Sequence, residues 1–238
     1  MLLKEYLSKN FIKAQLIEYA RILEVNNYSG LRKDALLEKI AKAFCNQEML
    51  RIRTLCLTDV QLKLFREACK EPIAVPSNES INFVVLEKYL LGSFEKDRNK
   101  FFVFEDVADT FYKIDDEAFK SIQPQNGWLT TCLSFFRKNY GIGKPEIIYK
   151  MYTQKFKCES VSEILTMILY FMPDDITRVK LVSMDDVGLK DLSKNHNLYS
   201  NEGLIVSVDL LKSGKLDEFI SRQKNNEINI PSVEDIYK

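Results

Sequence analysis

The stretch NFIKAQLIEYARILEVNNYSGLRKDALLEKIAKAF, Asn10–Phe44, contains two runs of apolar residues at helical spacing, separated by a polar turn. The first apolar face consists of Leu16, Ile17, Ala20 and Leu23, and the second of Leu36, Leu37, Ile40, Ala41 and Phe44. Between them, Asn26 to Gly30 has the Asn and Gly residues that end a helix and redirect the chain. Helices this short are not stable alone, so the sequence predicts a helical hairpin that packs on a lead helix around Leu2–Leu7.

The composition allows real hydrophobic cores but gives no global charge. The chain has 238 residues, 46% of them apolar, which is room for two small domains or one large one. Its 34 basic and 34 acidic side chains cancel. Any binding to nucleic acid would therefore depend on a local basic patch.

The five cysteines are widely spaced and form no C-x-x-C pair, which argues against a disulfide framework or a zinc site. They are expected to act as small core residues in a reducing cytoplasm. The N-terminus lacks the apolar run of a signal peptide, and no apolar segment approaches the ~20 residues of a membrane span. We therefore expect a cytoplasmic protein with no membrane insertion and no metal.

A family resemblance rests on the segment KAQLIEYARILEVNNYSGLRKDALLEKI within residues 10–44. It resembles the helix–loop–helix unit at the N-terminus of transcription terminator Rho and in SAP domains. The matching positions are Gly30, Arg32, Lys33, Asp34, Leu36 and Leu37. Relatives of this small motif bind DNA, RNA or only protein, and the resemblance implies that the second helix starts beside a nucleic-acid backbone. The chain as a whole is also similar, more loosely, to bacterial proteins in which such a start precedes a helical body.

An independent physical argument points to the same place. A helix N-terminus offers unpaired N–H groups and the positive end of a dipole, and Arg32 and Lys33 add two charges there. Residues 1–70 contain 13 basic and 8 acidic side chains, 13 − 8 = +5, which suits weak, salt-sensitive phosphate contacts. The candidate nucleic-acid-binding residues are Lys13, Tyr28, Gly30, Arg32, Lys33 and Lys39. The alternative is a solvated basic face on a purely structural hairpin.

Residues 57–123 have the outline of a winged helix. A capping box at Thr58 and Gln61 opens one helix, a second helix covers Ser80–Leu91 until Gly92 stops it, and the β-forming run Phe101–Phe104 follows. In this interpretation Ser80–Leu91 is the recognition helix, its exposed face consists of Asn82, Glu87 and Lys88, and the wing has Lys96, Arg98 and Lys100. Such a face is poor for reading base edges, so a winged helix used for packing fits better. The acidic stretch from Glu105 to Glu117 is interpreted as a solvated face.

Residues 124–238 are predicted to form a helical body with a polar tail. Helices are expected at Gly127–Tyr140, after Pro145 and after a capping box at Ser160, with a short helix at Met184–Leu192. Ile176–Val182 and Leu204–Val208 are strands or extended segments, His196 is a surface residue, and the tail Arg222–Lys238 is either flexible or docked on a neighbouring chain.

A second basic patch is expected between Arg137 and Lys157, where six cations oppose one acid, 6 − 1 = +5. Its candidate residues are Arg137, Lys138, Lys144 and Lys150. The tyrosines among them, Tyr140, Tyr149 and Tyr152, either stack on single-stranded bases or belong to the core of a helical hairpin.

The sequence has no phosphate-binding loop, dinucleotide fingerprint, nucleophile elbow or zinc-protease motif, and it has a single histidine. These features predict a mainly α protein with a small β hairpin, divided into residues 1–50, 57–123 and 124–238. The predicted function is non-enzymatic association with DNA or RNA, in a regulatory role, without cofactor or small-molecule substrate. The alternative is a scaffold that binds a protein partner or a second copy of itself.

Overall fold

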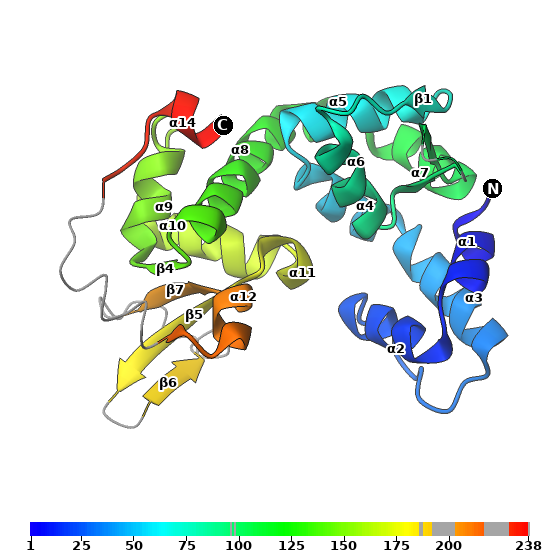
Figure 1. Ribbon diagram of the computed structural model, residues 1–238, viewed down its shortest axis with the longest axis horizontal. Helices are drawn as coiled ribbons and strands as arrows, with labels where there is room; N and C mark the ends of the chain where they lie inside the picture. Colours follow the sequence, from blue (N-terminus) through cyan, green and yellow to red (C-terminus); the bar gives the residue numbers. More distant parts are fainter. Residues whose placement is uncertain (96, 98, 186–187, 192–202, 217–228, 238) are drawn as a thin grey trace. The chain divides into compact units, whose positions relative to one another are not determined.

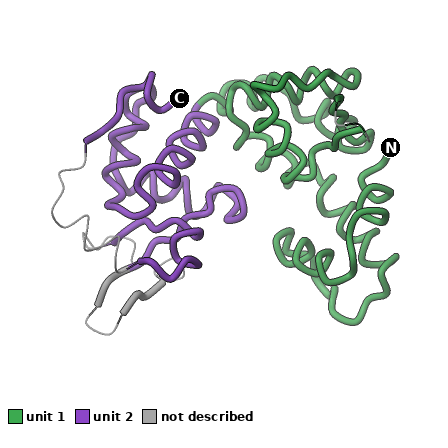
Figure 2. The backbone as a smooth tube through the Cα atoms, viewed as in Figure 1, with its two compact units in different colours: residues 1–124 green, residues 125–238 purple. Residues whose placement is uncertain are grey.

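The computed structural model describes residues 1–95, 97, 99–185, 188–191, 203–216 and 229–237. The chain forms two compact units, Met1–Pro124 and Gln125–Lys238, coloured separately in Figure 2. Helices dominate both units, and each has one small antiparallel sheet (Figure 1). The predicted fold class, mainly α with a small β hairpin, is confirmed.

Unit 1 consists mostly of short helices. They are α1 (Leu3–Asn10), α2 (Lys13–Ile22), α3 (Lys33–Phe44), α4 (Gln47–Leu55), α5 (Asp59–Ala68), α6 (Ser80–Lys88) and α7 (Glu105–Ile114). The predicted lead helix and helical hairpin correspond to α1, α2 and α3, which pack on one another. The Tyr6 ring of α1 lies 4.9 Å from the ring of Phe104, just before α7. Residues 1–50 thus share a core with the segment that follows, and the predicted three-part division of the chain stays a prediction.

The sheet of unit 1 has the strand order β1-β3-β2, with β1 at Ile73–Ala74, β2 at Gly92–Phe94 and β3 at Lys100–Val103. The expected hairpin after α6 is present. Gly92 is not a helix stop, however: α6 ends at Lys88, and Gly92 pairs with Val103 inside the sheet. A Cβ atom at Gly92 would lie 2.3 Å from the carbonyl oxygen of Phe102, so the close approach of the two strands requires glycine.

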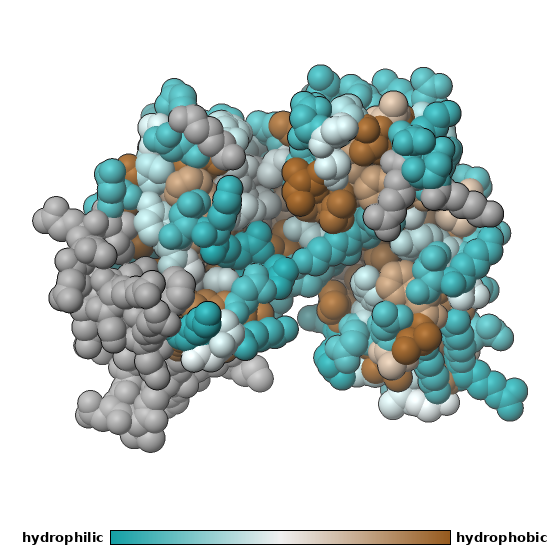
Figure 3. Space-filling model, in the orientation of Figure 1, coloured by the Kyte–Doolittle hydropathy of each residue, from teal (hydrophilic) through white to brown (hydrophobic). Residues whose placement is uncertain are grey.

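Of the three side chains predicted to be exposed on α6, Lys88 is exposed. Ile81 is 66% exposed and Val84 is 47% exposed, whereas Asn82 and Glu87 are half-buried. The predicted exposed face of this helix is therefore wrong for Asn82 and Glu87, because its near-continuous apolar sequence contains no polar stripe to fix its rotation. Figure 3 shows hydrophobic patches among the hydrophilic residues on the visible face of unit 1.

Two capping boxes were expected, and the first is confirmed. The Thr58 hydroxyl accepts a hydrogen bond from the Gln61 amide, and the Gln61 side chain accepts one from the Thr58 amide at 3.1 Å. At the second, the Ser160 hydroxyl caps the helix, but the Glu163 carboxylate accepts from the Glu159 amide at 2.8 Å instead of from Ser160.

Unit 2 combines helices with a four-stranded sheet. Its helices are the larger part of α8 (Glu117–Asn139), then α9 (Pro145–Tyr152), α10 (Val161–Thr166), η1 (Met167–Phe171), α11 (Asp174–Thr177), α12 (Val208–Ser213) and α14 (Val233–Tyr237). The strands are β4 (Ile142–Gly143), β5 (Val179–Asp185), β6 (Gly188–Asp191) and β7 (Leu204–Ser207), in the order β4-β7-β5-β6. The position of Pro145 at the start of α9 is confirmed.

The short helix predicted at Met184–Leu192 is wrong. Its described residues, 184–185 and 188–191, form the end of β5 and all of β6, which pair from Val182 with Asp191 to Asp185 with Gly188. A short apolar run is compatible with either structure, and here the antiparallel pairing of β5 with β6, as between Met184 and Leu189, accompanies the strand. His196 lies outside the described residues.

The described end of the polar tail packs on its own unit. We call residues 229–237 the C-terminal strap. The Tyr140 hydroxyl donates to the Asn229 carbonyl at 2.6 Å, Gln154 donates to the Pro231 carbonyl at 2.8 Å, and the Tyr237 ring lies 5.3 Å from the Trp128 ring. This part of the tail therefore covers Trp128, while residues 222–228 and 238 lie outside the described residues.

All five cysteines are free thiols. Cys56 and Cys132 are buried and the other three are half-buried. Burial raises the pKa of Cys45 and of Cys69 to about 12. Within the described residues, no helix combines the length and the apolar character needed to cross a membrane.

Candidate functional site

The start of α3, the predicted phosphate contact, is only partly open. Arg32 occupies the N-cap position and is exposed. Lys33, the first helical residue, donates from Nζ to the carbonyl of Ser8 at 3.0 Å and so ties α3 to the end of α1. Asp34, in the first turn, already places a negative charge at the positive end of the helix. Of the predicted cationic pair, only Arg32 is open to a partner.

The other predicted contact residues are divided in the same way. Lys39 donates to the carbonyl of Asn26 at 3.1 Å and holds the loop before α3. Tyr28 is half-buried in that loop, and its hydrogen bond with Arg21 raises the pKa of the guanidinium. Gly30 adopts a φ of +86°, which turns the chain toward α3. Lys13 is exposed at the start of α2. Of the residues predicted to contact nucleic acid, Lys13 and Arg32 are thus the two that are exposed and have no partner among the described residues.

Arginines account for much of the predicted excess of +5 charges in residues 1–70. Three of these arginines form ion pairs or ring contacts within the fold. Arg51 pairs with Asp116 at 2.7 Å, and Arg66 pairs with Asp115 at 2.6 Å. Arg53 is 3% exposed, with its guanidinium 5.6 Å from the Phe44 ring centre. Without these three, the excess of five falls to two, 5 − 3 = 2. In the stretch interpreted as a solvated acidic face, Asp116 is exposed and Asp115 is half-buried, and their ion pairs hold α4 and α5 to the start of α8.

The four residues of the second predicted basic patch differ in exposure. Lys138, Lys144 and Lys150 are exposed. Arg137 is half-buried and donates to the carbonyl of Ile176 at 3.4 Å and to the Ser134 hydroxyl at 3.1 Å.

The tyrosines of this patch belong to the fold, as the alternative interpretation has it. Tyr152 is 1% exposed, which leaves no ring face for a base. The Tyr149 hydroxyl donates to the Cys158 carbonyl at 3.5 Å, and the Tyr140 hydroxyl donates to the C-terminal strap. The stacking interpretation is therefore wrong for Tyr152, and the other two hydroxyls are engaged within the unit.

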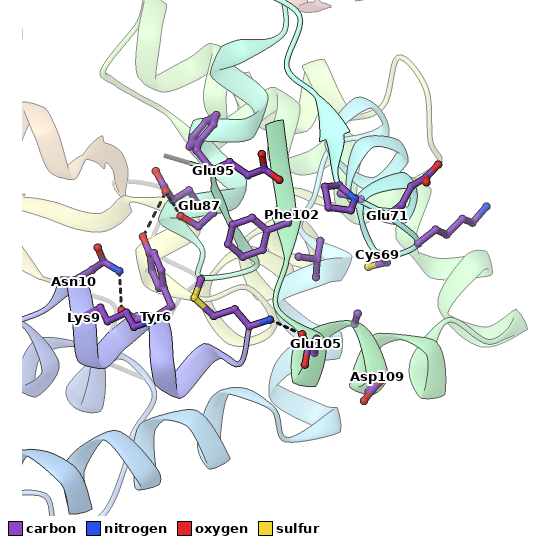
Figure 4. Close-up of a pocket in the computed structure, with 18 of the residues that line it drawn as sticks. Tyr6, Lys9, Asn10, Cys69, Glu71, Glu87, Glu95, Phe102, Glu105 and Asp109 are labelled. Atoms are coloured by element: carbon purple, nitrogen blue, oxygen red, sulfur yellow. Dashed lines mark hydrogen bonds and ion pairs between the residues drawn. The ribbon is translucent and has the colours of Figure 1, made fainter. Parts of the chain in front are cut away.

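A different concavity lies in unit 1, with a volume of about 1320 Å³ (Figure 4). We call it the unit 1 groove. It is formed by α1, the end of α5, the β2–β3 hairpin and α7, and its aromatic lining consists of Tyr6, Phe94, Phe102 and Tyr112. Phe102 lies in the middle, with Tyr6 and Glu87 on one side and Cys69 and Glu71 on the other (Figure 4).

The described charges of the groove are mostly negative. Its acidic lining residues are Glu71, Glu87, Glu95, Asp97, Glu105 and Asp109, and its basic ones are Lys9 and Lys70. Glu105 accepts the amine of Met1 in an ion pair. A backbone hydrogen bond from Asn99 lowers the pKa of Asp97. The groove is therefore a concave surface with an aromatic floor and acidic walls.

Glu87 is the most firmly positioned of these acids. It is half-buried, and its Oε1 accepts from the Ser93 hydroxyl at 2.7 Å and from the Tyr6 hydroxyl at 3.4 Å. Ser93 itself is 5% exposed, and burial raises the pKa of Tyr6. Two neutral hydroxyls thus fix the carboxylate in place and leave its charge uncompensated by these bonds.

The sequence does not reveal this groove, because its lining comes from segments far apart in the chain, between Met1 and Tyr112. A weak signal exists at Glu87, a carboxylate at the penultimate position of a predominantly apolar helix. Among the described residues, no group of three or more His, Cys, Asp and Glu side chains could hold a metal ion.

Comparisons with protein-family models, with curated proteins and with solved structures found no match to this chain.

Proposed function

We propose that this chain is a non-catalytic interaction protein whose unit 1 groove receives a segment of a partner protein. The groove itself is the observation that carries the proposal. Its volume of about 1320 Å³ exceeds the roughly 300–1,000 Å³ of pockets that enclose small ligands. Its aromatic floor provides the kind of residue that dominates binding energy at protein interfaces.

The exposed face of α6 supports a protein partner over a nucleic acid. Ile81 and Val84 point to solvent from the helix that a DNA-reading winged helix would place in the major groove. Apolar side chains there offer no hydrogen bonds to base edges. In this proposal the winged-helix-like segment 57–123 serves as a packing scaffold in a cytoplasmic protein.

A peptide-library selection tests the proposal. The full chain is screened against displayed peptides of random sequence, and the selected peptides are titrated against Tyr112→Ala and Tyr170→Ala variants. Tyr112 lines the groove and is 56% exposed, whereas Tyr170 is 53% exposed in unit 2. We expect Tyr112→Ala to weaken binding several-fold and Tyr170→Ala to leave it unchanged. Selection of no peptide, or equal affinities for both variants, would contradict the proposal.

A second candidate function is association with DNA or RNA through the module of α2 and α3, in a regulatory role. It is favoured by the exposed Arg32 at the start of α3, together with the resemblance to Rho N-terminal and SAP units. Such contacts would be few and salt-sensitive, since each neutralised phosphate adds to the salt dependence.

The second candidate is tested with labelled single-stranded and duplex oligonucleotides at low salt. The Lys13→Ala/Arg32→Ala variant removes two exposed cations, and Lys212→Ala/Lys215→Ala, which removes two exposed cations of unit 2, is the matched control. We expect affinity to fall with salt and with the first variant only. No binding at low salt, or equal loss in both variants, would rule this function out.

A further inference from the structure

We propose that the unit 1 groove takes an extended, Lys- and Arg-rich segment of a partner protein. This inference rests on the proposed function and specifies the chemistry of the partner. Six acidic side chains line the groove in the described part of the chain, against two lysines and the Met1 amine, an excess of 6 − 3 = 3 negative charges. A cationic segment complements this surface, and a phosphate backbone is repelled by it.

Several of the carboxylates are available to a partner. Glu71, Glu95 and Asp109 form no ion pair with any residue that the structure describes, and they come from three different parts of the fold. Glu71 follows α5, Glu95 follows β2 and Asp109 lies on α7. Carboxylates spaced in this way can meet successive cations along one extended chain, whereas a single compact cation would contact one of them.

The inner part of the groove offers a more specific contact. Glu87 is held by the hydroxyls of Ser93 and Tyr6, so its orientation is set before a partner arrives. The Tyr6 and Phe102 rings beside it provide faces that attract a cation electrostatically. A guanidinium or ammonium group placed there would gain both a charged hydrogen bond and a cation–π contact.

Unit 2 contains an internal example of this chemistry. The Lys155 ammonium lies 5.4 Å from the Trp128 ring centre and 5.5 Å from the Tyr237 ring centre. It also lies 2.9 Å from the Tyr237 hydroxyl. The groove provides comparable aromatic faces and adds full negative charges to them.

Three labelled peptides of equal length test the inference: one rich in Lys and Arg, one with Gln at those positions and one with Glu. Binding to the full chain is measured by fluorescence anisotropy at low and high salt. We expect the cationic peptide to bind best and to lose affinity with salt. The triple variant Glu71→Gln/Glu95→Gln/Asp109→Asn should weaken it roughly tenfold, because each exposed ion pair contributes a few-fold.

The matched control is Glu24→Gln/Asp34→Asn/Glu48→Gln, which removes the same charge from exposed acids outside the groove lining. It should leave the affinity within about twofold, since exposed charges outside the lining act on the peptide only through screened attraction. A neutralised Lys70, Lys70→Gln, should strengthen binding of the cationic peptide. Circular dichroism confirms that each variant is folded.

The outcomes separate the inference from the proposed function. If the Gln peptide binds as well as the cationic one and Tyr112→Ala weakens both, the groove binds peptides and the charge selectivity is overturned. Equal weakening by the two triple variants would also overturn it, because overall charge would then explain the binding. If no peptide of any charge binds, and library selection also fails, the proposed function falls with it.

Discussion

Asp116 connects two helices through a small set of directed bonds. Its carboxylate accepts from both terminal nitrogens of Arg51 on α4, at 3.0 and 2.7 Å, and from the Phe119 amide in the first turn of α8 at 2.7 Å. The hydrogen bond from Arg51, followed by that from Phe119, lowers the pKa of Asp116 to about 2. Two-point contact with a guanidinium is geometrically specific, which makes this residue a local determinant of the packing of α4 on α8.

The lowered pKa predicts an acid-dependent loss of stability. Because the folded value lies below the unfolded value of about 3.9, the contribution of Asp116 is complete above pH ~4 and is lost as the pH falls toward 2. The Asp116→Asn variant should be less stable than the native chain at pH 6, and this difference should shrink between pH 4 and 2. Urea unfolding across this range measures it. A stability difference that stays constant with pH would contradict the assignment.

At the scale of elements, the β2–β3 hairpin depends on one glycine. A Cβ atom at Gly92 would lie 2.3 Å from the Phe102 carbonyl oxygen and 2.7 Å from the Phe101 ring. Gly92→Ala should therefore destabilise unit 1 by at least about 2 kcal/mol, since backbone cannot move away as a flexible side chain could. Lys100→Ala, an exposed change in the same hairpin, should have little effect. Thermal unfolding followed by circular dichroism distinguishes the two, and a native-like Gly92→Ala would show that the strands tolerate separation.

The elements themselves show what sequence can and cannot predict. The capping box at Thr58 and the proline at the start of α9 are local signals, and both are confirmed. The segment Met184–Leu192 was mispredicted because a short apolar run fits a helix or a strand equally well, and its described residues pair locally as β5 and β6. The sequence allowed exposed cations to be named. It did not reveal that Lys33 and Lys39 donate hydrogen bonds to the carbonyls of Ser8 and Asn26. The groove depends entirely on tertiary packing and so left almost no sequence signal.

At the scale of the whole molecule, the two compact units differ in their intrinsic spectroscopic probes. The chain has one tryptophan, Trp128, which is 1% exposed in unit 2, and its indole N–H donates to the Tyr152 carbonyl at 3.0 Å. Tryptophan fluorescence therefore reports on unit 2, whereas far-ultraviolet circular dichroism reports on the helices of both units. Chains with more than one unit often depart from two-state unfolding.

We expect the two probes to respond differently to changes in one unit. Gly92→Ala should lower the midpoint of the circular dichroism transition, or split it, and leave the fluorescence midpoint nearly unchanged. Truncation after residue 228 removes the C-terminal strap and should lower the fluorescence midpoint, because it uncovers Trp128. Superimposable transitions for both probes in both variants would show that the chain unfolds as a single cooperative body.

The raised pKa of the half-buried Cys69 thiol has a practical consequence for probing this protein. Cys69 lines the groove, and its pKa of about 12 leaves very little thiolate at neutral pH, so alkylating reagents should modify it slowly. The rate of that modification measures occupancy of the groove, because a segment bound in the groove would shield Cys69 and slow its labelling further. The labelling rate of Cys158 in unit 2 serves as the internal reference. Mass spectrometry of the alkylated cysteines could thus monitor occupancy of the groove without any dye on either partner.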